Sequence, residues 1–146
     1  MTTTLKSSVS GFSLIEVMAV VAIISIITAI AYPSYTSSVV KAHRTAAKSC
    51  LTEYAQYMER YHTSNMAYDQ TPTGKVFSLP VLSCSTQSNI GQRYTFTIDT
   101  LSRSTFRLLA TPIGVQLNND KECAILTLNQ DGTRTASGTA GAAVCW

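Results

Sequence analysis

Four cysteines are the residues of this chain best suited to chemistry: Cys50, Cys84, Cys123 and Cys145. A zinc site or a redox pair needs cysteines close together, as in C-x₂-C, and none of the four has a neighbour at such spacing. Structural disulfides are therefore favoured, and four cysteines allow three connectivities. Because disulfides persist in oxidising compartments, the cysteines indicate a domain outside the cytosol.

Other groups that could carry catalysis or bind a metal are few. The histidines, His43 and His62, have no nucleophile motif near them. His43 lies on an apolar helix face, where a buried histidine is the commoner case, and His62 falls at a helix end that favours an imidazolium. Asn118, Asp120 and Glu122 could contact Ca²⁺, but they lack the spacing of a calcium loop, so we favour a polar turn. We expect no enzyme, no cofactor and no metal.

A lone carboxylate, Glu16, stands within a long apolar run from Phe12 to Tyr32. A helix over this run would be about 30 Å long, enough to cross the hydrocarbon core of a bilayer. A charge inside a membrane costs several kcal/mol and usually has a function. An ordinary secretory signal is cut after its apolar segment. Here the polar leader meets the apolar run at Gly11–Phe12, so a cut at that junction would leave the helix on the mature chain.

The sequence GFSLIEV at this junction resembles the class III signal of type IV pilins and pseudopilins. Four later segments are similar to minor pilins of the PilE type, which belong to type IVa pili: AYPSY at 31–35, AQYMERYHT at 55–63, ATPIG at 110–114 and CAILTLNQDGTRT at 123–135. The first motif is specific for the superfamily, whereas the weaker later motifs extend the resemblance over the whole chain. One departure is Ser25, which stands where many members have a helix-breaking glycine.

This resemblance implies several roles for particular residues. A prepilin peptidase would cut between Gly11 and Phe12, and the new amino terminus at Phe12 would be methylated. Glu16 would meet the Phe12 amine of a neighbouring subunit, since opposite charges offset part of each other's desolvation cost. Of the possible connectivities the resemblance favours Cys123–Cys145, which closes a C-terminal loop as in the D-region of pilins. Cys50 is then paired with Cys84, which would hold the loop to the helix, and each disulfide would contribute about 3 kcal/mol.

The resemblance also implies an α+β fold, the type IV pilin fold, in which a long N-terminal helix packs on a small antiparallel β-sheet with a C-terminal disulfide loop. We expect three parts. Residues 1–11 form a leader that the peptidase removes, and residues 12–32 form a hydrophobic transmembrane and assembly helix. Residues 33–146 form a periplasmic or extracellular globular domain.

Apolar periodicity indicates the elements of this domain. Residues 12 to about 62 are predicted to form one helix, since the apolar positions of its second half recur every three or four residues, at His43, Ala47, Cys50, Tyr54, Met58 and Tyr61. The polar composition of residues 63–92 predicts a long ordered loop. Alternating apolar residues predict strands near 94–98, 106–110 and 123–129, with a short edge strand at 133–135.

The balance of basic and acidic residues does little to narrow the class of function. The chain has 11 basic and 8 acidic residues, which does not by itself indicate nucleic-acid binding. Lys41, Arg44 and Lys48 fall on the helix face opposite the apolar one, where they would face solvent or the next subunit. Binding to DNA phosphates needs clustered cations. The candidate contacts to DNA or a partner are Lys41, Arg44, Lys48, Arg93, Arg103, Arg107 and Arg134.

We expect a structural minor subunit of a type IV pilus that promotes assembly, lies in or at the tip of the fibre, and serves adhesion, twitching motility or DNA uptake. The alternatives are a receptor pilin that binds DNA or a surface, a major pilin, and a type II secretion pseudopilin. The implied partners are other pilins, contacted through N-terminal helices, the prepilin peptidase and the inner-membrane assembly platform. The expected location is the inner membrane and then the pilus, with a Gram-negative source favoured.

Overall fold

The computed structural model of the chain describes residue 11 and residues 13–146. Residues 1–10 of the expected leader and Phe12, the expected new amino terminus, lie outside the described residues. Two compact units divide the chain, Met1–Thr36 and Ser37–Trp146. Helix α1 (Leu14–Asn65) belongs to both units, and we treat each unit by itself.

The helical part of the first unit is apolar and uncovered. Its side chains from Leu14 to Thr36 are all exposed, and the mean hydropathy of α1 reaches 2.6 over an 18-residue window. The hydroxyls of Ser25 and Thr28 donate to the carbonyl oxygens four residues earlier, each at 2.8 Å, so these polar groups have partners within the helix. By length and composition this helix can cross a membrane.

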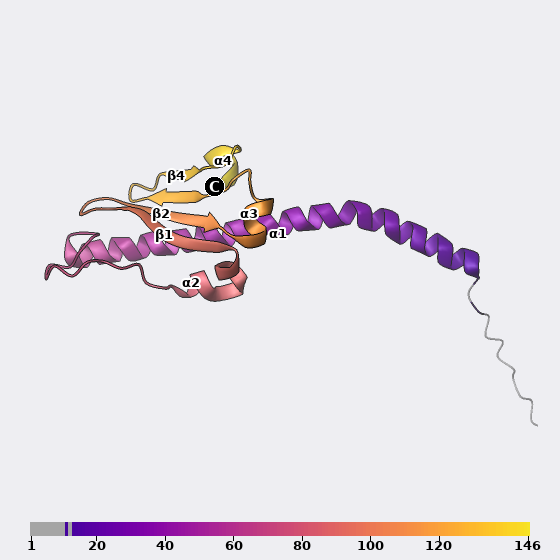
Figure 1. Cartoon of the computed structure of the whole chain (residues 1–146), viewed down its shortest axis with the longest axis horizontal. Coiled ribbons are helices and arrows are strands. Elements are labelled where there is room, and N and C mark those ends of the chain that lie inside the picture. Colours follow the sequence, from indigo (N-terminus) through magenta and orange to yellow (C-terminus); the bar gives the residue numbers. More distant parts are fainter. Residues whose placement is uncertain (1–10, 12) are drawn as a thin grey trace, which may run out of the picture. The chain divides into compact units, whose positions relative to one another are not determined.

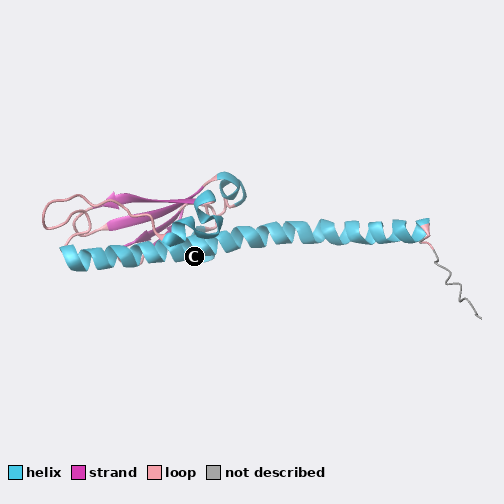
Figure 2. Cartoon of the chain, turned by 90° about the horizontal axis from the view of Figure 1, so that it is seen from below, coloured by secondary structure: helices cyan, strands magenta, loops and turns pink. Residues whose placement is uncertain are grey.

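The second unit, which we call the head (Ser37–Trp146), contains the β-sheet, and the second half of α1 covers one of its faces (Figures 1 and 2). Four antiparallel strands lie in the order of the sequence: β1 (Tyr94–Leu101), β2 (Phe106–Pro112), β3 (Leu126–Asn129) and β4 (Arg134–Ala136). The expected fold class, a long helix on a small antiparallel sheet, is confirmed.

The core lies between α1 and the sheet. On α1 the buried residues recur every three or four positions, which is the spacing of one helix face. On β2 every second residue from Phe106 to Ala110 is at most 1% exposed, which is the spacing of one sheet face. Each large apolar side chain buried there contributes about 1.5–3 kcal/mol. The helix contributes Ala47, Cys50, Leu51, Tyr54 and Met58, while His43 and Tyr61 are only half-buried.

The head also contains short helices. Before β1 lie α2 (Ser83–Thr86) and the 3₁₀ helix η1 (Gln87–Gln92), α3 (Gly114–Asn119) connects β2 to β3, and α4 (Gly141–Cys145) follows β4. The first two occupy part of the segment that the sequence predicts as a loop. The third strand is also shorter than the prediction of 123–129, because the chain turns at Ala124, where φ is 50°, before β3 begins.

Two disulfides hold the loops of the head to its core. Cys50 of α1 is joined to Cys84 of α2, and Cys123 is joined to Cys145 of α4, with Cα atoms 5.5 Å apart in each case. The pair Cys123–Cys145, which the pilin resemblance favoured, and the remaining pair Cys50–Cys84 are both as expected. Because a cross-link restricts the unfolded chain, each stabilises the head by about 3 kcal/mol.

The head has two ends, which we name the base and the far end. At the base, where α1 enters the head, Gln116 of α3 donates to the carbonyl oxygen of Val40 at 3.2 Å. At the far end, where α1 stops at Asn65, the amide of Tyr68 donates to the carbonyl oxygen of Arg103 in the β1–β2 turn at 3.1 Å. Figure 2 shows α1 running along the sheet between these ends.

Candidate functional site

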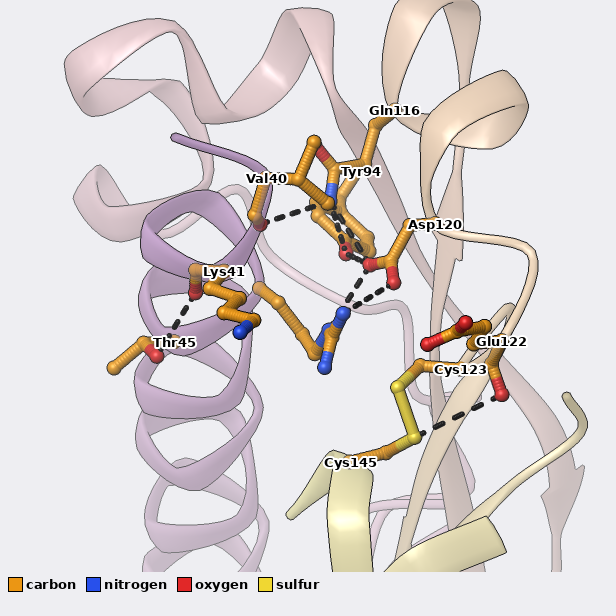
Figure 3. A network of polar contacts seen from close by, with 10 residues as sticks. Val40, Lys41, Thr45, Tyr94, Gln116, Asp120, Glu122, Cys123 and Cys145 are labelled. Atoms are coloured by element: carbon orange, nitrogen blue, oxygen red, sulfur yellow. Dashed lines mark hydrogen bonds and ion pairs between the residues drawn. A yellow bond between two sulfur atoms is a disulfide. The ribbon is translucent and has the colours of Figure 1, made fainter. Parts of the chain in front are cut away.

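A buried polar network at the base holds Arg44, one of the cations singled out from the sequence. Its guanidinium contacts both carboxylate oxygens of Asp120, at 2.6 and 3.1 Å, and Asp120 has no exposed side-chain surface (Figure 3). The hydroxyl of Tyr94 and the amide nitrogen of Gln116 donate to Asp120, each at 2.9 Å. Burial raises the pKa of Tyr94, and the hydrogen bond to Asp120 raises it further.

This network changes the interpretation of two sets of candidates from the sequence, the contacts to DNA or a partner and the calcium ligands. Arg44 was expected on a solvent-facing stripe, but its side chain is only 12% exposed, so we leave it out of the candidate contacts. The helical pattern could not reveal this, because α3, 70 residues or more along the chain, covers that side of α1. Asp120 has its oxygens occupied by these donors, so it is no free calcium ligand. Among the described residues, no three His, Cys, Asp or Glu side chains gather as metal ligands would.

Two further candidate cations have partners within the head. The ammonium group of Lys48 donates to the carbonyl oxygen of Trp146 at 3.3 Å, and Arg107 forms an ion pair with Asp99 at 3.3 Å. Both side chains of that ion pair are about half exposed, so the pair contributes little to stability. It does, however, neutralise the charge of Arg107 locally.

A groove of about 530 Å³ lies between α1 and the β3–β4 hairpin at the far-end half of the head. Phe106 and Leu128, both buried, contribute to its apolar lining. Exposed Arg60 of α1 and exposed Arg134 of β4 line the groove from its two sides. Gln130 also lines it and is held by a hydrogen bond from the Phe106 amide to its side-chain oxygen at 3.3 Å. We call this the arginine groove.

The two arginines keep their charges available. Neither forms an ion pair with any acidic group in the part of the chain that the structure describes. The guanidinium carbon of Arg134 lies 5.3 Å from the centre of the Trp146 ring, a cation–π contact that uses no acidic partner. Positive charge is thus presented from both walls of one groove.

Glu59 also lines the arginine groove, and its carboxylate has a partner in the segment after α1. Its carboxylate accepts a hydrogen bond of 2.9 Å from the hydroxyl of Tyr68, a residue of the segment after α1. Burial, with the hydrogen bond and charge of Glu59, raises the pKa of Tyr68 to about 12. Tyr68 therefore remains a donor at any physiological pH, and the pair ties the segment after α1 to the helix.

The remaining cations divide between the two ends of the head. Arg103 and Lys75 are exposed at the far end, where Arg103 borders a second hollow of about 390 Å³. Lys41 is exposed and Arg93 half-buried at the base. Sequence reasoning missed Arg60 and Lys75. Arg60 follows Gln56 by one helical turn at the edge of the apolar face, but only the position of the β3–β4 hairpin shows which helix edge lines a groove.

Comparison with solved structures finds pilins. The chain is similar to the non-core minor pilin PilV of Neisseria meningitidis, with 26% identity, a TM-score of 0.50, and coverage of 70% of this chain and 90% of that one. A type IV pilin from Shewanella oneidensis is 23% identical, with a TM-score of 0.45 over 65% of this chain and 89% of that one. A comparison with curated protein sequences gave no match.

Two family models match the sequence. The prokaryotic N-terminal methylation motif matches residues 6–32, which contain GFSLIEV. The model described as "Type IV minor pilin ComP, DNA uptake sequence receptor" matches residues 33–127. The resemblance to type IV pilins is thereby confirmed, as is the expectation of a minor pilin, although the later motifs had seemed most similar to the PilE type. This second match covers more than half of the chain, so the chain belongs to the ComP family of type IV minor pilins.

Proposed function

We propose that this minor pilin is a DNA receptor and that the arginine groove is its contact with DNA. The observation that carries the proposal is the pair Arg60 and Arg134, which line one groove without acidic partners among the described residues. Free, clustered cations are what phosphate binding needs. The description of the ComP family as DNA uptake sequence receptors supports the same function.

The charge at the far end is nearly balanced, which constrains how DNA would bind. Its unpaired cations are Arg60, Lys75, Arg103 and Arg134, and its acids are Glu59, Asp69 and Asp131. The described residues of the far end therefore produce no strong positive field, and DNA binding would depend on a few discrete contacts. Two or three phosphate contacts correspond to a slope of about −2 to −3 in log K against log salt. Side-chain amides such as Gln130 in the same groove could contact base edges.

Replacing Arg60 and Arg134 together by alanine tests this proposal. We expect the Kd for a short labelled DNA duplex to rise at least tenfold at moderate salt, and the salt slope to fall by about two, because two phosphate contacts are lost. Fluorescence anisotropy across a salt series measures both quantities.

The matched control is Arg107→Ala, which removes an exposed arginine that Asp99 already neutralises. This variant should bind DNA almost as the parent does. An unchanged Kd in the double variant, or an equal loss in Arg107→Ala, would show that DNA does not use the arginine groove.

Promotion of fibre assembly is a second proposed role, and the exposed apolar helix of the first unit favours it. An apolar surface of this length does not stay in water, so it must be covered by lipid or by the helices of other pilins. We propose that cleavage after Gly11 and methylation of Phe12 prepare this helix, and that Glu16 pairs with the Phe12 amine of a neighbour. The protein would then lie in the inner membrane before it enters a pilus.

Glu16→Val separates cleavage from assembly. We expect the variant to be processed normally, so that its intact mass is that of a chain beginning at Phe12. Its level in sheared fibres should nevertheless be at least tenfold lower than that of the parent. The reason is that an amine without its carboxylate partner costs several kcal/mol in an apolar surrounding. Quantitative mass spectrometry of fibres measures both outcomes, with Val17→Leu as the apolar control. Parental levels in fibres would contradict the pairing of Glu16 with the Phe12 amine. An uncut variant would show that Glu16 is needed for cleavage, and a processed chain that does not begin at Phe12 would contradict the cleavage site.

A further inference from the structure

The arginine groove contains a carboxylate as well as its two arginines, and a contact with DNA does not explain why. Glu59 lines the same groove as Arg60 and Arg134, yet among the described residues it forms no ion pair with either. Its carboxylate accepts a hydrogen bond of 2.9 Å from the hydroxyl of Tyr68 instead. We infer that Tyr68 is a positioning residue of the groove, whose hydroxyl holds the Glu59 carboxylate so that both guanidinium groups stay available for phosphate. This inference rests on the proposed function and names what keeps its groove ready to bind.

A carboxylate that shares a groove with guanidinium groups would ordinarily pair with one of them. Such a pair is charge-assisted and can form two parallel hydrogen bonds, whereas a phenol donates one hydrogen bond and brings no charge. Because Glu59 and both arginines are exposed, the pair would be modest, worth up to about fivefold in an equilibrium constant. One well-placed hydrogen bond is therefore enough to compete with it.

Tyr68 is fixed by contacts with three different parts of the head. The centre of its ring lies 4.4 Å from that of His62 on α1 and 4.9 Å from that of Phe106 on β2. Its amide donates to the carbonyl oxygen of Arg103 at 3.1 Å, and the residue is only 6% exposed. A hydroxyl on a ring that is already ordered loses little further conformational entropy when it donates to Glu59, which favours this hydrogen bond.

A strained turn after α1 brings Tyr68 back beside Glu59, nine residues earlier in the chain. The amide of Met66 donates to the carbonyl oxygen of His62 at 2.7 Å, and Met66 has a φ of 57°, in the left-handed region that residues with a side chain seldom adopt. Strain of this kind persists where the surrounding contacts enforce it, as those of Tyr68 do here. The turn at Met66 is therefore part of the structure that places the Tyr68 hydroxyl.

Tyr68→Phe tests the inference, because it removes the hydroxyl and keeps the contacts of the ring. We expect the released carboxylate to pair with Arg60 or Arg134. The Kd for the labelled duplex should then rise about threefold to fivefold, and the salt slope should fall by about one. The matched control is Tyr61→Phe, since the Tyr61 hydroxyl has no hydrogen-bond partner in the part of the chain that the structure describes. An equal loss of affinity in the two variants would overturn the inference.

Glu59→Gln distinguishes a positioning role from structural damage. Glutamine can still accept a hydrogen bond from Tyr68 but carries no charge, so this variant alone should bind DNA at least as tightly as the parent. Added to Tyr68→Phe, Glu59→Gln should restore the parental Kd, because no carboxylate remains to neutralise an arginine. A loss that persists in the double variant would mean that Tyr68 acts only on the shape of the far end, and the inference would be wrong.

A measurement without DNA separates this inference from the proposed function. In the full chain, held in detergent micelles and containing isotope-labelled arginine, NMR measures how fast the Nε–H protons of Arg60 and Arg134 exchange with water. We expect one of these protons to exchange about threefold more slowly in Tyr68→Phe, since an ion pair protects it, and the parental rate to return with Glu59→Gln. Unchanged exchange would overturn the inference even if the groove binds DNA. Slower exchange in a protein that binds no DNA would support the positioning role and contradict the proposed function alone.

Discussion

Replacing Asp120 by asparagine is expected to lower the free energy of unfolding of the head by about 3–5 kcal/mol. Asp120 is fully buried and accepts hydrogen bonds from Arg44, Tyr94 and Gln116. Asparagine keeps the shape of the side chain but removes the charge, and its amide nitrogen would face these donors. Arg44, itself only 12% exposed, would then hold a charge with neither a partner nor water.

Thermal unfolding of the oxidised head measures this effect. The head contains the whole hydrophobic core and both disulfides, so it is suitable for such a measurement. For a domain of this size, the loss corresponds to a fall in Tm of roughly 12 °C or more. Asp99→Asn is the matched control, because it breaks the half-exposed ion pair with Arg107 and should cost less than about 1 kcal/mol.

A double variant separates the charge effect from a loss of packing. Arg44→Met removes the uncompensated guanidinium, so Arg44→Met with Asp120→Asn should be more stable than Asp120→Asn alone. If both single variants and the control unfolded within 2 °C of the parent, the network would be no stabilising feature. If the double variant were the least stable of all, the cost would come from shape and not from an unpaired charge.

The long helix and the strands of the sheet could be predicted from the sequence because their apolar residues are periodic, whereas the fold class followed from the resemblance to type IV pilins. The apolar positions of α1 from Ala47 to Met58 repeat at helical spacing, and the buried residues of the structure are largely these. The alternation of Phe106, Leu108 and Ala110 likewise predicted β2. In each case a single local pattern is sufficient, because one face must contact the core.

The short helices could not be predicted in the same way. Helix α3 has six residues, and α2 has four, which is too short for a periodic pattern to develop. Both are held by tertiary contacts instead: α2 by the Cys50–Cys84 disulfide, and α3 by the hydrogen bond of Gln116 to Val40. Such contacts join residues far apart in the sequence, and no local pattern reports them.

The candidate binding residues show the same limit. Arg44 and Arg60 are both arginines on α1, yet the first is buried against Asp120 and the second lines an open groove. Their difference depends on which segments fold over each part of the helix. Sequence reasoning singled out Arg44 and missed Arg60, because only the position of α3 and of the β3–β4 hairpin divides the cations into paired and free groups.

Gly138→Ala is expected to destabilise the head by about 3 kcal/mol, the upper end of the usual cost of overpacking. A Cβ at Gly138 would meet the carbonyl group of Glu122 and would lie 2.7 Å from the amide nitrogen of Cys123. These are backbone atoms, which cannot move aside as the end of a flexible side chain can. Gly138 also donates to the carbonyl of Cys123 at 3.1 Å, so a shift would break that hydrogen bond.

The structural change caused by Gly138→Ala should be concentrated in the C-terminal loop, and opening of this loop can be measured separately from unfolding of the core. Because the Cys123–Cys145 disulfide holds both ends of the loop, the segment around Gly138 should open while the core stays folded. We expect Tm to fall by about 12 °C and proteolysis to begin within the loop. The loop carries Arg134, so the proposal that DNA contacts the arginine groove predicts that DNA affinity falls with loop order even though no cation is removed. Thr139→Ala, which changes an exposed neighbour, is the control. A stable Gly138→Ala variant with an intact loop would mean that this close approach is not required by the fold.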